Sequence, residues 1–299
     1  MALDADALCR QPRKLGKSLK KLRQDSSPDL VHKLRTRTRR FEAMVDALEL
    51  DSRKNERRLI RALKPVRRRA GRVRDMDVLT QFASRPQLQD EGDCSIRLLE
   101  HLGSARERQA RKLQKRTRLD YVLLRERLRK CAQFLDKTLQ ARAAGSSPKN
   151  SSRSEEWAEK ATALALRLEA ELRNWRALNQ ENLHPFRLTV KKLRYVLQMA
   201  KKADNDFVDA LGEVKDSIGE WHDWQELSGI AKKVIEHSGC KLLQDIDRTA
   251  REKFEEALAA SNRLRQNYLN RRPQTGRRMK LQRQHATSPA VISASALAA

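Results

Sequence analysis

Two stretches of the chain carry histidine and basic residues at the same spacing. One runs from Val31 to Phe41 (VHKLRTRTRRF) and the other from Leu183 to Leu193 (LHPFRLTVKKL), and both have the form H-x-x-R-x-x-x-[RK]-[RK]. Guanidinium groups form paired hydrogen bonds with phosphate oxygens, and an imidazole gains charge beside an anion. These residue types therefore favour the non-covalent binding of phosphate groups.

A second pair of motifs follows the basic ones. The stretches 71–79 (GRVRDMDVL) and 219–227 (GEWHDWQEL) share the form G-x-x-x-D-x-x-x-L, and 43 residues separate His32 from Asp75 where 39 separate His184 from Asp223. A single basic run is usually only a solvated helix face, but such a face has no reason to keep its pattern twice. Order and spacing together indicate an internal duplication with a period of about 150 residues.

The aspartates of the second motif, Asp75 and Asp223, have two interpretations. They could be metal ligands, or each could orient a basic side chain of its own half of the chain. We favour the second interpretation, because no acidic cluster of the kind that holds a divalent cation surrounds either residue. We therefore expect no metal site.

Both basic motifs are predicted to be helices. Their apolar stripes follow helical spacing and consist of Val31, Leu34, Thr38 and Phe41 in the first copy and Leu183, Phe186, Val190 and Leu193 in the second. Ser27 and Pro28 suit the N-cap and the first helical position. The cations lie beside the apolar stripe rather than opposite it, so we expect them at a bundle edge, in a groove that faces another helix.

A further run of cations follows in the next predicted helix. It consists of Arg61, Lys64, Arg67, Arg68, Arg69, Arg72 and Arg74, with no acidic residue between its ends. Three consecutive arginines cannot face one groove, because successive helical residues point in different directions. We expect part of this run, including Arg74, to join the same groove.

The composition predicts an all-α fold. Only 10 of the 299 residues are Gly and 8 are Pro, and residues that lose little entropy in a helix dominate. Helix breaks are predicted at 26–28, 84–86, 145–148 and 271–273. They divide the chain into an N-terminal tail (1–10), a first helical bundle (11–143), a linker (144–154), a second bundle (155–270) and a disordered basic tail (271–299).

Charge and cysteine usage limit the possible partners. Lys and Arg number 65 against 39 Asp and Glu, and the net charge of +26 favours an anionic partner that relieves self-repulsion. The four cysteines form no C-x-x-C pair, which argues against a zinc site and a disulfide framework. No membrane span and no signal peptide are recognisable. We expect a soluble cytoplasmic protein that uses no cofactor.

The stretches VHKLRTRTRRFEAM, GRVRDMDVL and LHPFRLTVKKLRYVL, in tandem, resemble the CHAD family, the conserved-histidine α-helical domain, over residues 11–270. The resemblance implies two tandem four-helix bundles related by pseudo-two-fold symmetry around a basic central cavity. It also implies binding of inorganic polyphosphate, often at polyphosphate granules. The basic signature of the family falls on His32, Arg35, Arg39, Arg40, His184, Arg187, Lys191, Lys192, Arg194 and Tyr195.

Two positions depart from the symmetry of the motifs. The first copy has Glu42 where the second has Arg194, and the second copy has Trp221 and His222 before its aspartate where the first has Val73 and Arg74. We therefore expect asymmetric binding, with a less basic groove on the side of the first copy.

Other function classes compete with polyphosphate binding. No catalytic apparatus is visible, since the chain has no complete phosphate-binding loop, no H-E-x-x-H and no G-x-S-x-G motif, so we predict a binding protein rather than an enzyme. Nucleic-acid binding is the alternative, because basic helices bind any phosphate backbone, although aromatic residues make up only 4% of the chain and offer few stacking platforms. A scaffold role, in which the C-terminal tail recruits other proteins, is compatible with either.

Overall fold

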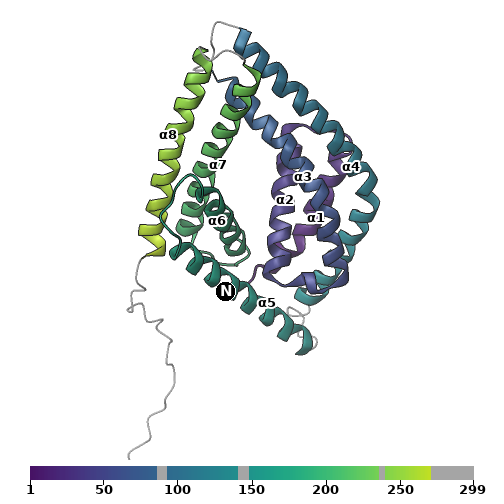
Figure 1. Cartoon of the computed structure of the whole chain (residues 1–299). Helices are drawn as coiled ribbons and strands as arrows, with labels where there is room; N and C mark the ends of the chain where they lie inside the picture. The colour runs from purple at the N-terminus through teal and green to yellow at the C-terminus, as the bar shows by residue number, and fades with distance from the viewer. Residues whose placement is uncertain (86–92, 141–147, 236–239, 271–299) are drawn as a thin grey trace, which may run out of the picture.

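The computed structural model describes residues 1–85, 93–140, 148–235 and 240–270 (Figure 1). The first half contains α1 (Ala5–Leu22), α2 (Pro28–Ala47), a short 3-10 turn η1 (Leu50–Ser52), α3 (Lys54–Ala83) and α4 (Asp93–Gln140). The second half contains α5 (Pro148–Arg173), α6 (Leu183–Leu197), α7 (Asn205–Val234), α8 (Lys241–Leu264) and a π-helical turn η3 (Arg265–Leu269). The described residues include no β-strand beyond one isolated bridge, so the all-α prediction is confirmed.

Local sequence signals explain where several helices begin. The carboxylate of Asp4 caps α1 by accepting a hydrogen bond from the amide of Ala7 (2.9 Å), and Asp204 caps α7 in the same way. Pro28 occupies the first turn of α2, as predicted, but the side chain of Ser27 makes no capping hydrogen bond. The start of α2 therefore depends on the fixed φ of proline more than on the serine hydroxyl.

The structure places two predicted boundaries differently. Residues 5–10 belong to α1 rather than to a tail, and Leu8 and Cys9 are buried because this end of α1 packs on the core. Residues 148–154 belong to α5 rather than to a linker, with Pro148 in the first turn, where its missing N–H removes no helical hydrogen bond. The remainder of the predicted linker (144–147) and the predicted tail (271–299) lie outside the described residues.

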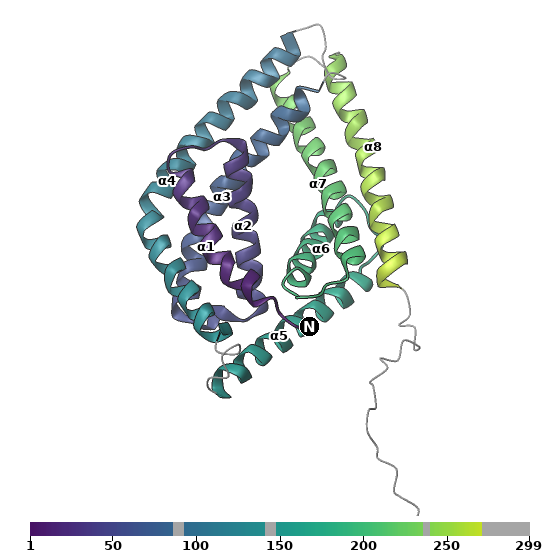
Figure 2. The same cartoon turned by 180° about the vertical axis from the view of Figure 1, so that it is seen from behind.

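The two halves contact one another at several places. Figures 1 and 2 show α2 on the side of α6 and α3 on the side of α7, with the tips of α3 and α4 meeting those of α7 and α8. The start of the chain adds another link, because Leu3 pairs with Ala200 in an antiparallel bridge just after α6. The helices thus enclose a central region that both halves border.

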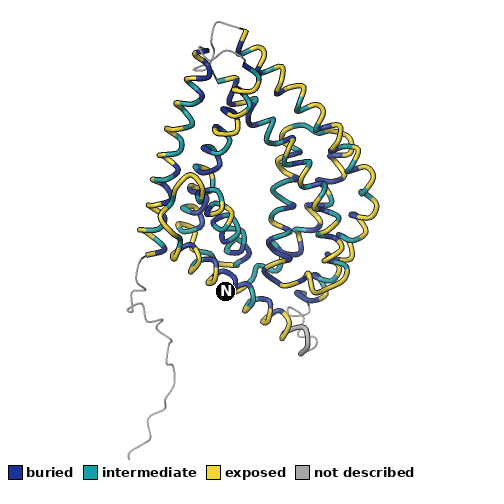
Figure 3. The backbone as a smooth tube through the Cα atoms, in the orientation of Figure 1, coloured by how far each residue is buried: buried dark blue, intermediate teal, exposed yellow. Residues whose placement is uncertain are grey.

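The hydrophobic core is shared between the halves. Among the described residues, the larger of two buried clusters draws side chains from each of α1 to α8, and the smaller one joins the tips of α3 and α4 to those of α7 and α8. In the smaller cluster Phe82 stacks on Trp224, with ring centroids 4.8 Å apart. Figure 3 shows buried positions on the packed sides of the helices and exposed positions facing outward. The pseudo-two-fold relation between the halves stays a prediction.

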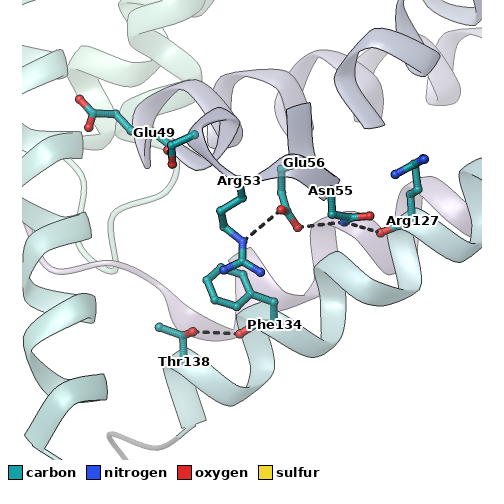
Figure 4. A network of polar contacts seen from close by, with 8 residues as sticks. Glu49, Arg53, Asn55, Glu56, Arg127, Phe134 and Thr138 are labelled. Atoms are coloured by element: carbon teal, nitrogen blue, oxygen red, sulfur yellow. Dashed lines mark hydrogen bonds and ion pairs between the residues drawn. The ribbon is translucent and has the colours of Figure 1, made fainter. Parts of the chain in front are cut away.

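A buried carboxylate fixes the start of α3 against α4. Glu56 is fully buried and accepts hydrogen bonds from Arg53 Nε (3.1 Å) and Asn55 Nδ2 (3.0 Å) (Figure 4). The same amide donates to the carbonyl of Arg127 in α4 (3.2 Å), and the guanidinium of Arg53 lies 3.3 Å from the ring centroid of Phe134. These contacts satisfy a charge whose burial would otherwise be unfavourable.

Candidate functional site

The two repeated basic motifs face one cavity. This central cavity has a volume of about 590 Å³ and lies between α2, α3, α6 and α7. Among the predicted site residues, those that line it are His32, Arg35, Arg74, His184, Arg187, Lys191 and Tyr195. Residues from the two halves of the sequence therefore meet at one place, as the duplication predicts.

The glycine of the second motif lets an arginine cross the next helix. Arg187 extends from α6, and its Nε donates a hydrogen bond to the carbonyl of Lys215 in α7 (2.9 Å). A Cβ at Gly219 would lie 3.1 Å from Cζ of Arg187 and closer still to Nη2, so a larger residue requires the guanidinium to move. Gly71 lies beside Arg35 in the same way but more loosely, since its Cβ would be 3.9 Å from Nε. The two motifs therefore form one unit, an arginine and the glycine that it crosses.

The aspartates of the second motif lie near the same arginines. Arg35 and Asp75 form an ion pair at 3.9 Å within the first half. In the second half, burial lowers the pKa of Arg187 and the charge of Asp223 opposes that shift. Both observations agree with the interpretation that each carboxylate orients a basic side chain of its own half. Within the described part of the chain, no group of three or more His, Cys, Asp or Glu residues could hold a metal ion.

The cations of the central cavity are close enough to change the titration of Lys191. Its pKa is lowered to about 7, first by burial and then by repulsion from Arg35, Arg187, Arg39 and Lys215. No described carboxylate forms an ion pair with its ammonium group. Lys191 is therefore a partly buried cation whose electrostatic environment is unfavourable in the free protein.

The histidines of the basic motif also lose their protons more readily than in water. Burial lowers the pKa of His32, with further repulsion from Arg74 and Arg35, and burial and His222 lower that of His184. The rings of His184 and His222 meet edge to face with centroids 4.6 Å apart, and Nδ1 of His184 is buried with no hydrogen-bond partner among the described residues. This ring nitrogen can bond to an oxygen of a ligand.

The wall of the central cavity carries carboxylates as well as cations, so it is less basic than predicted. The acidic residues that line it are Asp75, Asp216, Glu220, Asp223 and Glu226. Three of them are paired with cations of the wall: Asp75 with Arg35 at 3.9 Å, Asp216 with Lys215, and Glu220 with Arg85 at 3.3 Å. Burial raises the pKa of Asp75, Asp223 and Glu226. The predicted basic cavity is therefore a mixed one, because buried cations on facing helices need nearby carboxylates.

A smaller hollow of about 290 Å³ adjoins the central cavity through Lys191, which lines both. Arg39 and Lys192 line the smaller hollow instead of the central cavity. Both have acidic neighbours, since Lys192 pairs with Asp46 of α2 at 2.7 Å and Arg39 lies 4.0 Å from Glu42. The pair formed by Lys192 joins α6 to α2. Arg39 is less well satisfied, because its buried Nε has no hydrogen-bond partner among the described residues and burial and Arg67 lower its pKa.

Two predicted site residues line neither hollow. Arg194 crosses α7 as Arg187 does: its Nε donates to the carbonyl of Val208 (3.1 Å) and would lie 3.2 Å from a Cβ at Gly212. Arg194 therefore attaches α6 to α7, because its position on the helix points it at α7. Arg40 is exposed and lies outside both hollows.

Two cations outside the repeated basic motifs, Lys215 and Arg85, also line the central cavity. Lys215 stands four residues before Gly219, as Arg67 stands four residues before Gly71. A comparison of the two copies could therefore have identified a cation at this position. Arg85 follows the end of α3 at a predicted helix break, and no periodicity could assign it to the site.

The fold and the site define a class: an all-helical domain in which two copies of a basic motif meet at one cavity. A family model described as the CHAD domain matches residues 6–232, and the chain belongs to this family. No curated protein sequence matches the chain. None of the helices in the described ranges is long and apolar enough to cross a membrane.

Proposed function

We propose that the protein binds inorganic polyphosphate, without a chemical reaction, in the central cavity. The observation that carries this proposal is the environment of Lys191, a partly buried ammonium that lines the cavity among other cations and whose pKa is lowered to about 7. Such an arrangement destabilises the free protein, and a ligand with several negative charges offsets the repulsion. Membership of the CHAD family is consistent with a polyphosphate-related role.

The size of the central cavity favours a thin polymer. A volume of about 590 Å³ falls within the range of small-ligand sites and admits a short segment of an unbranched phosphate chain. A nucleic-acid duplex is too wide to enter, so nucleic acid, the alternative ligand, would have to bind as a single strand or on the outer surface. Under this proposal the protein acts in the cytoplasm, at polyphosphate granules, as the family resemblance implies.

The side chains of the wall have distinct roles in the proposal. Lys191 and Arg74, which form no ion pair with described residues, neutralise the phosphate oxygens. The unpartnered Nδ1 of His184 bonds to a phosphate oxygen. Arg35 is oriented by Asp75 and presents its guanidinium to the ligand. Arg187 mainly holds α6 on α7 through its bond to Lys215, so its replacement would disturb the fold as well as binding.

The test is a competition between long-chain polyphosphate, duplex DNA and RNA for the purified chain at several salt concentrations, since each phosphate contact steepens the salt dependence. We expect polyphosphate to bind most tightly at near-physiological salt. Lys191→Met should weaken its binding by about tenfold or more. Lys202→Met, which removes the same charge from an exposed position, is the matched control and should change affinity less than about twofold. Equal binding of all three polymers, or equal affinities of the two variants, would contradict the proposal.

A further inference from the structure

A third hollow lies away from the central cavity and from the smaller hollow beside it, between α1 and α4. It has a volume of about 340 Å³, and we call it the outer groove. Its floor is formed by carbon-rich residues, Pro12, Gly16, Leu128 and Ala132. Its rim carries Lys17 and Lys20 on α1 and Arg125 and Arg129 on α4, all of them exposed. An apolar floor between two basic rims differs from the mixed, charged wall of the central cavity.

The rim cations of the outer groove have no partners within the described ranges. None of Lys17, Lys20, Arg125 and Arg129 forms an ion pair or a side-chain hydrogen bond to a described residue. The one carboxylate that lines the groove, Asp136, is already paired with Arg13. The rim therefore presents an uncompensated positive charge on both sides of the floor.

Exposed apolar side chains also lie on α4, near the outer groove. Leu119, Val122 and Leu123 are 69%, 75% and 45% exposed, and they are three of the six large hydrophobic residues that are exposed in the described chain. Scattered exposed apolar residues are ordinary, but a group within five positions of one helix indicates a binding surface. Val122 lies closest to the groove, since it stands next to Tyr121 and three residues before Arg125, which line the groove itself.

A mostly basic set of residues on α4 is spaced in a way that suits a helical partner. Lys115, Arg118, Val122, Arg125 and Arg129 follow one another at intervals of three and four, which places them on a single face of the helix. They extend over fifteen positions, which span about 21 Å at about 1.5 Å per residue, or roughly four turns. A second helix laid along this face would meet Val122 among the cations and Leu119 at the edge of the face.

We propose that the outer groove, with Leu119 and Val122, is a docking site for an acidic amphipathic helix of another protein. The apolar face of that helix covers the floor and the exposed side chains of α4, and its carboxylates on both edges pair with the rim cations. A second copy of this protein, docked through the same surface, is disfavoured as the partner because like charges would face each other. A bare phosphate chain would pair with the rim but leave the apolar surface uncovered. This inference goes beyond polyphosphate binding and uses none of the residues of the central cavity.

The probe is a synthetic three-heptad peptide with leucine on one face and glutamate on both flanks, compared with a scrambled peptide of the same composition. We expect the amphipathic peptide to bind the full chain about tenfold more tightly than the scrambled one in fluorescence anisotropy. The doubly substituted variants Lys17→Glu/Arg125→Glu and Leu119→Ser/Val122→Ser should each lose about tenfold in affinity. Lys201→Glu/Lys202→Glu, a matched reversal of two other exposed cations, should change it less than about twofold.

Measurements on the central cavity separate this proposal from the previous one. Lys191→Met should leave peptide binding unchanged, and the groove variants should keep polyphosphate binding within about twofold. Circular dichroism of each variant establishes that it is folded. Equal binding of the two peptides would overturn the proposal, as would unchanged peptide binding in both groove variants. A charge reversal that weakens polyphosphate or duplex DNA more than the peptide would instead make the groove a phosphate-polymer site.

Discussion

The ammonium of Lys191 links stability to pH. Its pKa of about 7 in the folded protein lies below the ordinary value of 10.5, so between these values the unfolded chain binds more protons than the folded one. The free energy of unfolding should therefore rise as pH increases from about 7 to 9. In Lys191→Met this contribution should be lost, and at pH 7 the variant should be more stable than the wild type by on the order of 2 kcal/mol. Denaturant titrations of both proteins at pH 7 and 9 measure the difference, and parallel pH profiles would contradict it.

The same residues predict that polyphosphate binding takes up protons. Burial and neighbouring cations lower the pKa values of Lys191, His32 and His184 in the free protein, and a bound polyanion should raise all three. Affinity should therefore increase as pH falls from about 8 to 6. Calorimetry in two buffers with different ionisation enthalpies measures the protons directly. An affinity that does not change with pH would show that these side chains do not contact the ligand.

The two motif glycines should respond differently to a methyl group. Gly219→Ala places its Cβ against the guanidinium of Arg187 and should lower the free energy of unfolding by about 1–3 kcal/mol. The Cβ of Gly71→Ala meets only an ordinary contact at 3.9 Å, so this variant should be neutral or slightly stabilising. Gly103→Ala, where no atom lies within 4 Å, is the control and should gain up to about 1 kcal/mol. Thermal unfolding of the three variants measures whether their stabilities follow this order, with Gly219→Ala the least stable.

The sequence predicted much of the candidate site at the scale of residues, because the repeat marked positions that must share a location. It could not separate Arg187, which lines the central cavity, from Arg194, which points at α7 and lines neither hollow. Both carry the same charge on one helix and both cross α7, and only the place of crossing distinguishes them: Arg187 crosses at Gly219, which lines the central cavity, and Arg194 at Gly212, which does not. The carboxylates Glu220 and Glu226 were missed for a similar reason, since no spacing rule links them to the basic motif.

At the scale of the helices, the contact between Phe82 and Trp224 closes one end of the molecule. Trp224 is fully buried in the cluster that joins the tips of four helices. Trp224→Ala should lower the free energy of unfolding by about 3–5 kcal/mol, because the stacking partner and the surrounding cluster lose a large buried surface. Leu166→Ala, at a residue 62% exposed in α5, should change it by less than about 0.5 kcal/mol. Calorimetric scans of both variants check this, and equal losses would be inconsistent with the shared cluster.

Helical periodicity predicted the elements well and some of their ends poorly. The start of α2 followed from proline chemistry that is local in the sequence. The inclusion of residues 5–10 in α1 follows from the cap formed by Asp4 and from the burial of Leu8 and Cys9, and periodicity alone did not predict it. The first residues of α5 have the composition of a linker, but Trp157 and Ala161 are buried further along, and this packing favours the helix over the propensity of its serines.

At the scale of the whole molecule, the shared core predicts that neither half is stable alone. The larger buried cluster includes side chains from every helix, so an isolated half would expose the surface that it normally buries against the other. A fragment of residues 1–140 should therefore show helical circular dichroism but no cooperative unfolding transition. Mixing it with a fragment of residues 148–270 should restore cooperativity. Sharp, independent transitions in the separate fragments would contradict a shared core.

The bridge between Leu3 and Ala200 has a consequence for how the protein is made. Backbone hydrogen bonds from Asp4 to Met199 and from Lys201 to Ala2 connect the first residues to a segment that the ribosome produces much later. At about 5–20 residues per second, α1 to α4 wait on the order of ten seconds before α6 emerges to receive them. During that interval the apolar side chains that later meet the second half are uncovered. The nascent chain, rather than the finished protein, is thus the form in which aggregation competes most strongly with folding.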